Sequence, residues 1–144
     1  MTRDTFLIVR AVFYRDVADM LTGGATAVLA AAARTWEVVE VPGAFEIPGA
    51  IAQAARGEGF AGYIALGCVI RGKTTHYDYI CSESARGLMS LAVRDRLAIG
   101  YGILTCETRA QAVERADPQQ GNKGADAANA ALAVAELRSR FAAS

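Results

Sequence analysis

The stretch GYIALGCVIRGKTTHYDYIC, residues 62–81, contains a strand, a turn and the start of a helix in direct succession. Residues 62–70 are apolar and include β-branched and aromatic side chains, which is typical of a buried strand. A turn at Arg71, Gly72 and Lys73 follows, and from Tyr77 onward apolar residues recur at helical spacing. A strand that leads through a turn into a helix is the first part of a crossover between parallel strands, so this stretch favours an α/β fold.

The same alternation of strand and helix runs through the rest of the chain. Three more short apolar segments, 6–12, 36–41 and 98–105, are predicted to be buried strands. Helical spacing predicts helices around 17–32, 47–54, 77–92, 108–116 and 123–141. This order predicts a four-stranded parallel sheet with helices on both faces, a three-layer α/β/α arrangement. Because no linker or repeat divides the sequence, we expect residues 1–144 to form one domain.

Composition argues against several classes of protein. Lysine and arginine together number 15, as do aspartate and glutamate, and a chain with zero net charge is poorly suited to bind nucleic acid. Neither a signal peptide nor an apolar run long enough to span a bilayer is seen, so we expect a cytoplasmic protein with no membrane partner. Hydrophobic residues make up 53% of the chain, which suggests that some apolar surface is buried between subunits of a homo-oligomer.

The three cysteines do not indicate a disulfide framework or a metal site. Cys68, Cys81 and Cys106 form no C-x-x-C pair, and each lies in an apolar segment. We expect them to be small core residues.

Residues 67–74, GCVIRGKT, match the pattern of a nucleotide-binding phosphate loop. The match is disfavoured because Val69 and Ile70 continue the strand, and their branched side chains resist the turn that such a loop requires. No strand ends in the aspartate that would hold magnesium.

Ligands of parallel sheets bind at the carboxyl ends of the strands, where this turn lies. Thr74 or Thr75 can cap the following helix, and the free N–H groups of its first turn suit an anion, although both threonines could be ordinary caps. His76, the only histidine, follows directly. A lone histidine is more often structural, but at a strand end it is a candidate for proton transfer.

Four segments together resemble the signature segments of the lumazine synthase family. They are VPGAFEIPGA (41–50), ALGCVIRGKTTHYDYIC (65–81), GILTCET (102–108) and AVERADPQQGNKG (112–124), and the likeness runs in order over residues 6–141. The resemblance implies a flavodoxin-like fold and a transferase without metal or organic cofactor. That transferase condenses 5-amino-6-(D-ribitylamino)uracil with 3,4-dihydroxy-2-butanone 4-phosphate to give 6,7-dimethyl-8-ribityllumazine, the penultimate step of riboflavin biosynthesis. It also implies a homo-oligomer, either a pentamer or a shell built from pentamers.

The resemblance further implies a role for each of thirteen residues. The ring and ribityl chain of the uracil substrate are bound by Phe13, Ala44, Phe45, Glu46, Val69 and Ile70. The phosphate site is lined by Lys73, Thr74 and Thr75. His76 transfers protons, and Arg115, which binds phosphate, comes with Tyr101 and Lys123 from the adjacent subunit.

Other interpretations of the same residues remain open. Phe13 could be a core residue, Glu46 a first-turn helix carboxylate, and Arg115 surface charge. A homologue with weak catalysis that binds lumazine or flavin, or that forms a shell, is the alternative function. The joint presence of His76, Arg115 and Lys123 favours the enzyme, because a carrier does not need a site for phosphate elimination.

Overall fold

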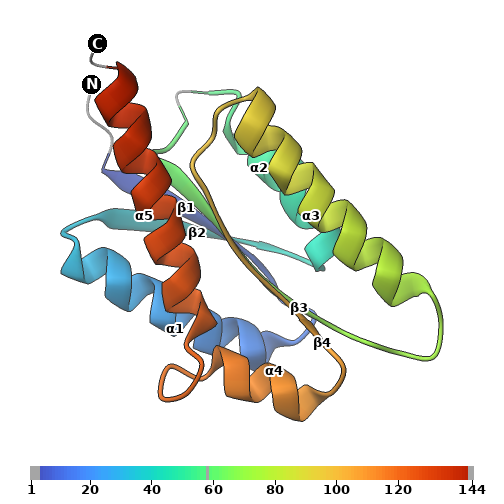
Figure 1. Ribbon diagram of the computed structural model, residues 1–144. Coiled ribbons are helices and arrows are strands. Elements are labelled where there is room, and N and C mark those ends of the chain that lie inside the picture. Colours follow the sequence, from blue (N-terminus) through green and yellow to red (C-terminus); the bar gives the residue numbers. More distant parts are fainter. Residues whose placement is uncertain (1–3, 58, 143–144) are drawn as a thin grey trace.

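The computed structural model describes residues 4–57 and 59–142 (Figure 1). Four strands form one parallel sheet in the order β2-β1-β3-β4. The strands are β1 (Thr5–Ala11), β2 (Thr35–Val41), β3 (Gly62–Ile70) and β4 (Ile99–Cys106). The helices are α1 (Arg15–Ala31), α2 (Ile47–Ala54), α3 (His76–Arg94), α4 (Arg109–Ala116) and α5 (Lys123–Ala142), with a 3₁₀ turn η1 (Ala44–Glu46) before α2.

The sheet separates two apolar cores, because successive side chains of a strand point to opposite faces. Phe6 and Ile8 of β1 pack toward α1, α4 and α5, whereas Leu7 and Val9 pack toward α2 and α3. Figure 1 shows the two groups of helices on opposite faces of the sheet. The predicted three-layer, flavodoxin-like α/β fold is therefore confirmed.

The predicted strands and helices are all present, with bounds that differ by one or a few residues. The predicted burial of the second strand is wrong, because nearly all of β2 is exposed. The side chains of Trp36, Val38 and Val39 are 37%, 43% and 41% exposed. β2 is an edge strand, and the helices of this chain leave its side chains open to solvent.

The apolar stripe predicted on α3 is only partly buried. Leu88 packs in the core, while Ala85 is exposed and Met89 is 63% exposed. The inward face contains Ser84 and Gly87, and a side chain at Gly87 would meet Pro48 of α2. Small residues therefore let the two helices approach closely, and they carry no apolar signal for a sequence pattern to detect.

Among the described residues, no helix combines the length and the apolar character needed to cross a membrane.

Candidate active site

A pocket of about 490 Å³ lies where β1, β2 and β3 end and α3 begins. We call it the central pocket. It is lined by Phe13, Tyr14, Pro42, Gly43, Ala44, Phe45, Glu46, Cys68, Val69, Ile70, Gly72, Thr74, His76, Tyr77 and Ile80. This is the carboxyl edge of a parallel sheet, the usual ligand position in such folds.

The turn after β1 contributes an exposed aromatic platform. Phe13 is 75% exposed, and its ring meets Tyr14 edge-on with 4.9 Å between the ring centres. Burying so exposed a ring against a flat heterocycle is favourable, and the contact with Tyr14 limits where the ring can lie. Phe13 is therefore not a core residue, which was the other interpretation of its sequence position.

The segment after β2 turns a carboxylate into the central pocket. Gly43 donates its backbone N–H to Glu46 Oε1 at 3.0 Å, so this oxygen caps η1. Among the described residues no hydrogen bond to the other oxygen, Oε2, is found. One oxygen of Glu46 thus has the local capping role weighed in the sequence analysis, while the second is available to a hydroxyl donor.

The end of β3 presents open backbone. Pairing of β3 with β1 stops at Leu66, whereas pairing with β4 continues to Ile70. Val69 and Ile70 both line the central pocket, and alternate residues of a parallel strand direct their N–H and C=O groups to opposite neighbours. The N–H of Arg71 donates to Cys106 O of β4, so the backbone of Val69, two residues earlier, also faces β4, whereas that of Ile70 faces the side where pairing with β1 has ended. The unpaired backbone groups of Ile70 can bind the polar edge of a heterocycle.

The turn between β3 and α3, residues 72–75, offers free hydrogen-bond donors. No amide N–H of these four residues donates a hydrogen bond within the part of the chain that is described. Thr74 Oγ1 accepts from the backbone N–H of His76 at 3.3 Å and so caps α3. Thr75, the other residue expected to be able to cap α3, makes no side-chain cap; its backbone dihedrals are helical, whereas capping residues usually have extended ones. The free N–H groups before a helix suit an anion.

A second, shallower pocket of about 480 Å³ lies along β4. This strand is the edge of the sheet opposite to β2. We call it the edge pocket. It is lined by Tyr101, Gly102, Ile103, Leu104, Thr105, Arg115, Lys123 and Asp126. Arg115 Nη1 donates to Thr105 O and to Cys106 Sγ, each at 3.4 Å, and Lys123 Nζ lies 3.3 Å from an oxygen of Asp126. Two cationic side chains, Arg115 and Lys123, thus lie near the edge strand β4.

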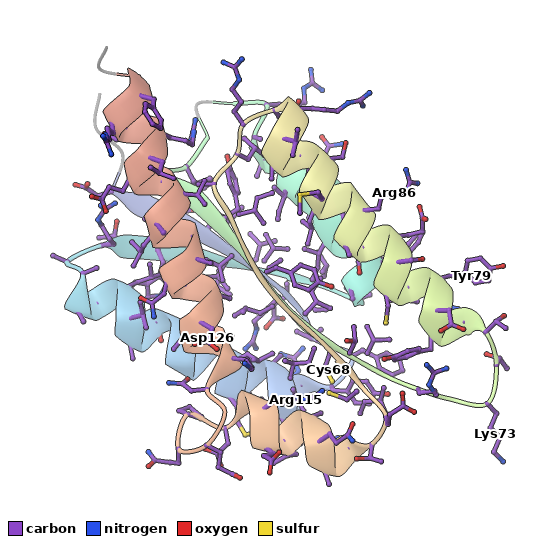
Figure 2. All side chains as sticks on the ribbon, viewed as in Figure 1. Cys68, Lys73, Tyr79, Arg86, Arg115 and Asp126 are labelled. Atoms are coloured by element: carbon purple, nitrogen blue, oxygen red, sulfur yellow. The ribbon has the colours of Figure 1, made fainter. Side chains whose placement is uncertain are left out.

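The thirteen residues expected from the sequence fall into three groups. Eight line the central pocket: Phe13, Ala44, Phe45, Glu46, Val69, Ile70, Thr74 and His76. Tyr101, Arg115 and Lys123 line the edge pocket instead, and so are not brought to the same cavity within one chain. Lys73 and Thr75 line neither, and Figure 2 shows Lys73 at the outer side of its turn, pointing away from the sheet.

Sequence reasoning missed some residues that line the central pocket. The helical pattern places Tyr77 and Ile80 on the apolar side of α3, and both line the pocket. Ile80 follows His76 by four positions, a spacing that puts the two on one side of the helix and could have found it, whereas Tyr77 follows by one position and gave no such signal. Burial raises the pKa of the Tyr77 hydroxyl, and contact with Cys81 adds to this. The hydroxyl therefore stays protonated near neutral pH.

The wall of the central pocket holds an unreactive thiol. Burial raises the pKa of Cys68 to about 12, so it is a neutral apolar group there and not a nucleophile. The three cysteines are free, and in the described part of the chain no group of histidine, cysteine, aspartate and glutamate is arranged to hold a metal ion.

Comparison with known proteins gives a consistent result. A family model described as 6,7-dimethyl-8-ribityllumazine synthase matches residues 4–139. The chain is 55% identical over 136 residues to the 6,7-dimethyl-8-ribityllumazine synthase of Novosphingobium aromaticivorans, covering 94% of this chain and 97% of that one. It is 52% identical over 138 residues to the protein of that name from Erythrobacter litoralis, with 96% and 98% covered. It is 53% identical over 142 residues to 6,7-dimethyl-8-ribityllumazine synthase 1 of Rhizobium meliloti, with 95% and 93% covered.

Proposed function

The chain belongs to the 6,7-dimethyl-8-ribityllumazine synthase family, and from this premise we propose how its residues divide the work of the reaction. The protein is a transferase of riboflavin biosynthesis. It condenses 5-amino-6-(D-ribitylamino)uracil with 3,4-dihydroxy-2-butanone 4-phosphate, and gives 6,7-dimethyl-8-ribityllumazine, phosphate and water.

The uracil substrate is held by the three strand ends. Phe13 stacks on the pyrimidine ring, the open backbone of Ile70, with Val69 beside it, binds its polar edge, and Glu46 accepts hydrogen bonds from the ribityl hydroxyls. The single observation that carries this assignment is that an exposed ring, a half-engaged carboxylate and unpaired strand backbone line one cavity. Ala44 and Phe45 complete the wall beside Glu46.

The butanone phosphate binds at the 72–75 turn. Its phosphate accepts hydrogen bonds from the free amide groups and from Thr74, at the start of α3. Thr75 and Lys73, which line neither pocket, keep the roles expected for them only as predictions.

The chemistry needs a proton shuttle and a close approach of two reactants. The substrate amine attacks the ketone and an imine forms with loss of water. Loss of a proton from the neighbouring hydroxyl-bearing carbon and departure of phosphate leave an enol, which tautomerises to a new carbonyl, and attack of the ribitylamine nitrogen on this carbonyl closes the ring with loss of a second water. His76, the first residue of α3, lies in the same pocket as the phosphate-binding turn and moves protons in these steps. Holding both substrates in one cavity supplies much of the rate.

We place Tyr101, Arg115 and Lys123 in the active site of a neighbouring subunit. They line the edge pocket, so within one chain they do not line the cavity that contains His76. A head-to-tail contact that brings the edge pocket of one subunit to the central pocket of the next would complete the site, and such contacts close into rings. A pentamer or pentamer-based shell, a cytoplasmic location and a single domain remain predictions.

The activity is tested by mixing the two substrates with purified protein and following lumazine formation by absorbance. We expect steady product formation, competitive inhibition by inorganic phosphate against the butanone phosphate, and no hydrolysis of ATP with magnesium. Absence of product would favour the carrier, and sustained ATP turnover would restore the nucleotide-loop interpretation of residues 67–74.

A further inference from the structure

The phosphate-binding turn has little internal support. All of residues 71–76 are exposed, and the amide groups of 72–75 have no hydrogen-bond acceptor in the described part of the chain. Such a turn loses conformational freedom when it binds an anion, and the cost falls if other contacts hold it in place beforehand. The question is which residue holds it.

Arg71, the residue between β3 and the turn, connects three neighbouring segments. Its Nε donates to Glu107 Oε2 at 3.0 Å, beyond the end of β4. Its Nη1 lies 3.7 Å from Asp78 Oδ1 in the first turn of α3. Its guanidinium carbon lies 4.4 Å from the ring centre of Tyr77, a wall residue of the central pocket. Its backbone N–H donates to Cys106 O at 2.9 Å.

The geometry separates Arg71 from the ligand itself. Ile70 and Gly72 on either side line the central pocket, but Arg71 does not. Its charge is already engaged by carboxylates: the hydrogen bond with Glu107 raises the pKa of the guanidinium, and Asp78 acts in the same direction. Each exposed ion pair is weak alone. One planar group that bridges two carboxylates and lies over a ring fixes the direction in which the chain leaves β3.

We propose that Arg71 is a positioning residue, which holds the 72–75 turn and Tyr77 in the arrangement that binds the phosphate of the butanone substrate. It acts through Glu107, Asp78 and Tyr77 and does not touch the phosphate. The proposal rests on the proposed function, because it takes the 72–75 turn as the phosphate site.

The first measurement separates the two substrates. In Arg71→Gln we expect KM for the butanone phosphate to rise about tenfold or more, since a displacement of about 1 Å in a positioned group can cost two orders of magnitude. KM for the uracil substrate should stay within about twofold, because Phe13 and Glu46 lie on other segments and because Val69 and Ile70 are held by strand pairing with β4. The inhibition constant of inorganic phosphate should rise with the first KM. Equal KM values in variant and parent would overturn the proposal.

Glu107→Gln distinguishes positioning from direct phosphate binding. If Arg71 bound the phosphate itself, removing the neighbouring negative charge would leave KM for the butanone phosphate unchanged or lower it. If Arg71 is a positioning residue, Glu107→Gln loosens the turn and raises that KM, and the double variant is little worse than Arg71→Gln alone. Arg86→Gln, which removes an exposed arginine–carboxylate pair with Glu83 further along α3, is the matched control and should change neither KM (Figure 2).

Hydrogen exchange of the ligand-free protein measures how firmly the turn is held. Because no phosphate is present, loss of a direct contact between Arg71 and phosphate could not change the exchange rate. Arg71→Gln should speed exchange of the first bonded amides of α3, those of His76, Asp78 and Tyr79, whose acceptors belong to Thr74 and Thr75, while peptides of β1 and α5 keep the parent rate. Unchanged exchange there would contradict the proposal even if KM rises.

Thr74→Val distinguishes failure of the proposed phosphate site at residues 72–75 from failure of the positioning role of Arg71. If neither Thr74→Val nor Arg71→Gln alters KM for the butanone phosphate, the phosphate binds elsewhere and the proposed site is wrong, and with it the positioning role. If Thr74→Val raises that KM and Arg71→Gln does not, the site stands and only the role of Arg71 is wrong.

Discussion

At the scale of single residues, the position of His76 decides what it can do. It is the first residue of α3, it is exposed, and it lines the central pocket beside the capping residue Thr74. Its backbone N–H donates to Thr74 Oγ1, so the start of the helix is fixed where the residue lines the cavity. A side chain that exchanges protons with both solvent and substrate needs this combination of a fixed backbone and an accessible ring.

We therefore expect His76→Ala to lower kcat by about 10²- to 10⁴-fold, the usual contribution of a positioned acid or base. Because the proposal assigns substrate binding to Phe13, Glu46 and the 72–75 turn, both KM values should change by less than about threefold. Steady-state kinetics with each substrate varied in turn provides the measurement, and gel filtration checks that the assembly is that of the parent. Turnover at the parent rate would exclude the proton-transfer role.

At the scale of helices and strands, the sequence allows the order of elements to be predicted but not what covers them. Four apolar segments alternating with helical patterns were enough for a parallel sheet, because such segments need crossover connections. The same apolar pattern gave the wrong burial for β2. The pattern shows that Trp36, Val38 and Val39 are apolar, but it does not show whether a helix of the same chain covers them.

In the candidate site, too, some features could be predicted from the sequence and others could not. Residues that strand ends and the turn before α3 bring together, such as Phe13, Glu46 and His76, could be placed at one edge of the sheet from sequence alone. Which threonine caps α3 could not be predicted, because Thr74 and Thr75 have the same hydroxyl group and the local backbone conformation decides which of them accepts the hydrogen bond. The free N–H groups of this turn indicated an anion site from the sequence alone, but the identity of the anion as the phosphate of a particular substrate came from family resemblance.

Close packing of α5 on α1 depends on a glycine that a hydrophobic pattern ignores. A Cβ at Gly124 would overlap the backbone carbonyl of Leu21, which cannot move without shifting α1. We expect Gly124→Ala to lower the free energy of unfolding by about 1–3 kcal/mol, the usual cost of overpacking. Gly23→Ala in α1 is the matched control, because its Cβ would meet nothing within 4 Å; there we expect a gain of about 0.5–1 kcal/mol.

Urea unfolding at one protein concentration measures both variants, so that any effect of subunit association on stability is the same for both. If Gly124→Ala were as stable as Gly23→Ala, the close approach of the two helices would not be a feature of the folded protein.

At the scale of the whole molecule, our proposal makes the two pockets two parts of one active site supplied by different subunits. The central pocket is lined by His76 and Phe13, while the edge pocket is lined by Arg115 and Lys123. Arg115 is held there by Thr105 O and Cys106 Sγ, so it is oriented by β4 of its own chain. An isolated subunit would thus lack a guanidinium at its own phosphate turn, and activity should require assembly.

Mixed assemblies test this arrangement directly. His76→Ala and Arg115→Ala should each be nearly inactive alone, because every site then lacks one of the two groups. When the two variants are co-assembled at random in equal amounts, a site is intact if its central pocket comes from an Arg115→Ala subunit and its edge pocket from a His76→Ala subunit. In a head-to-tail ring this occurs at about a quarter of the interfaces, so about a quarter of parent activity should return.

The double variant His76→Ala/Arg115→Ala, co-assembled with the parent at the same ratio, controls for mixing. It also leaves about a quarter of the sites intact if the groups come from two subunits, but about half if they come from one. Mixed assemblies of the single variants that stay as inactive as their parents, beside a control near one half, would mean that both groups serve the site of their own subunit.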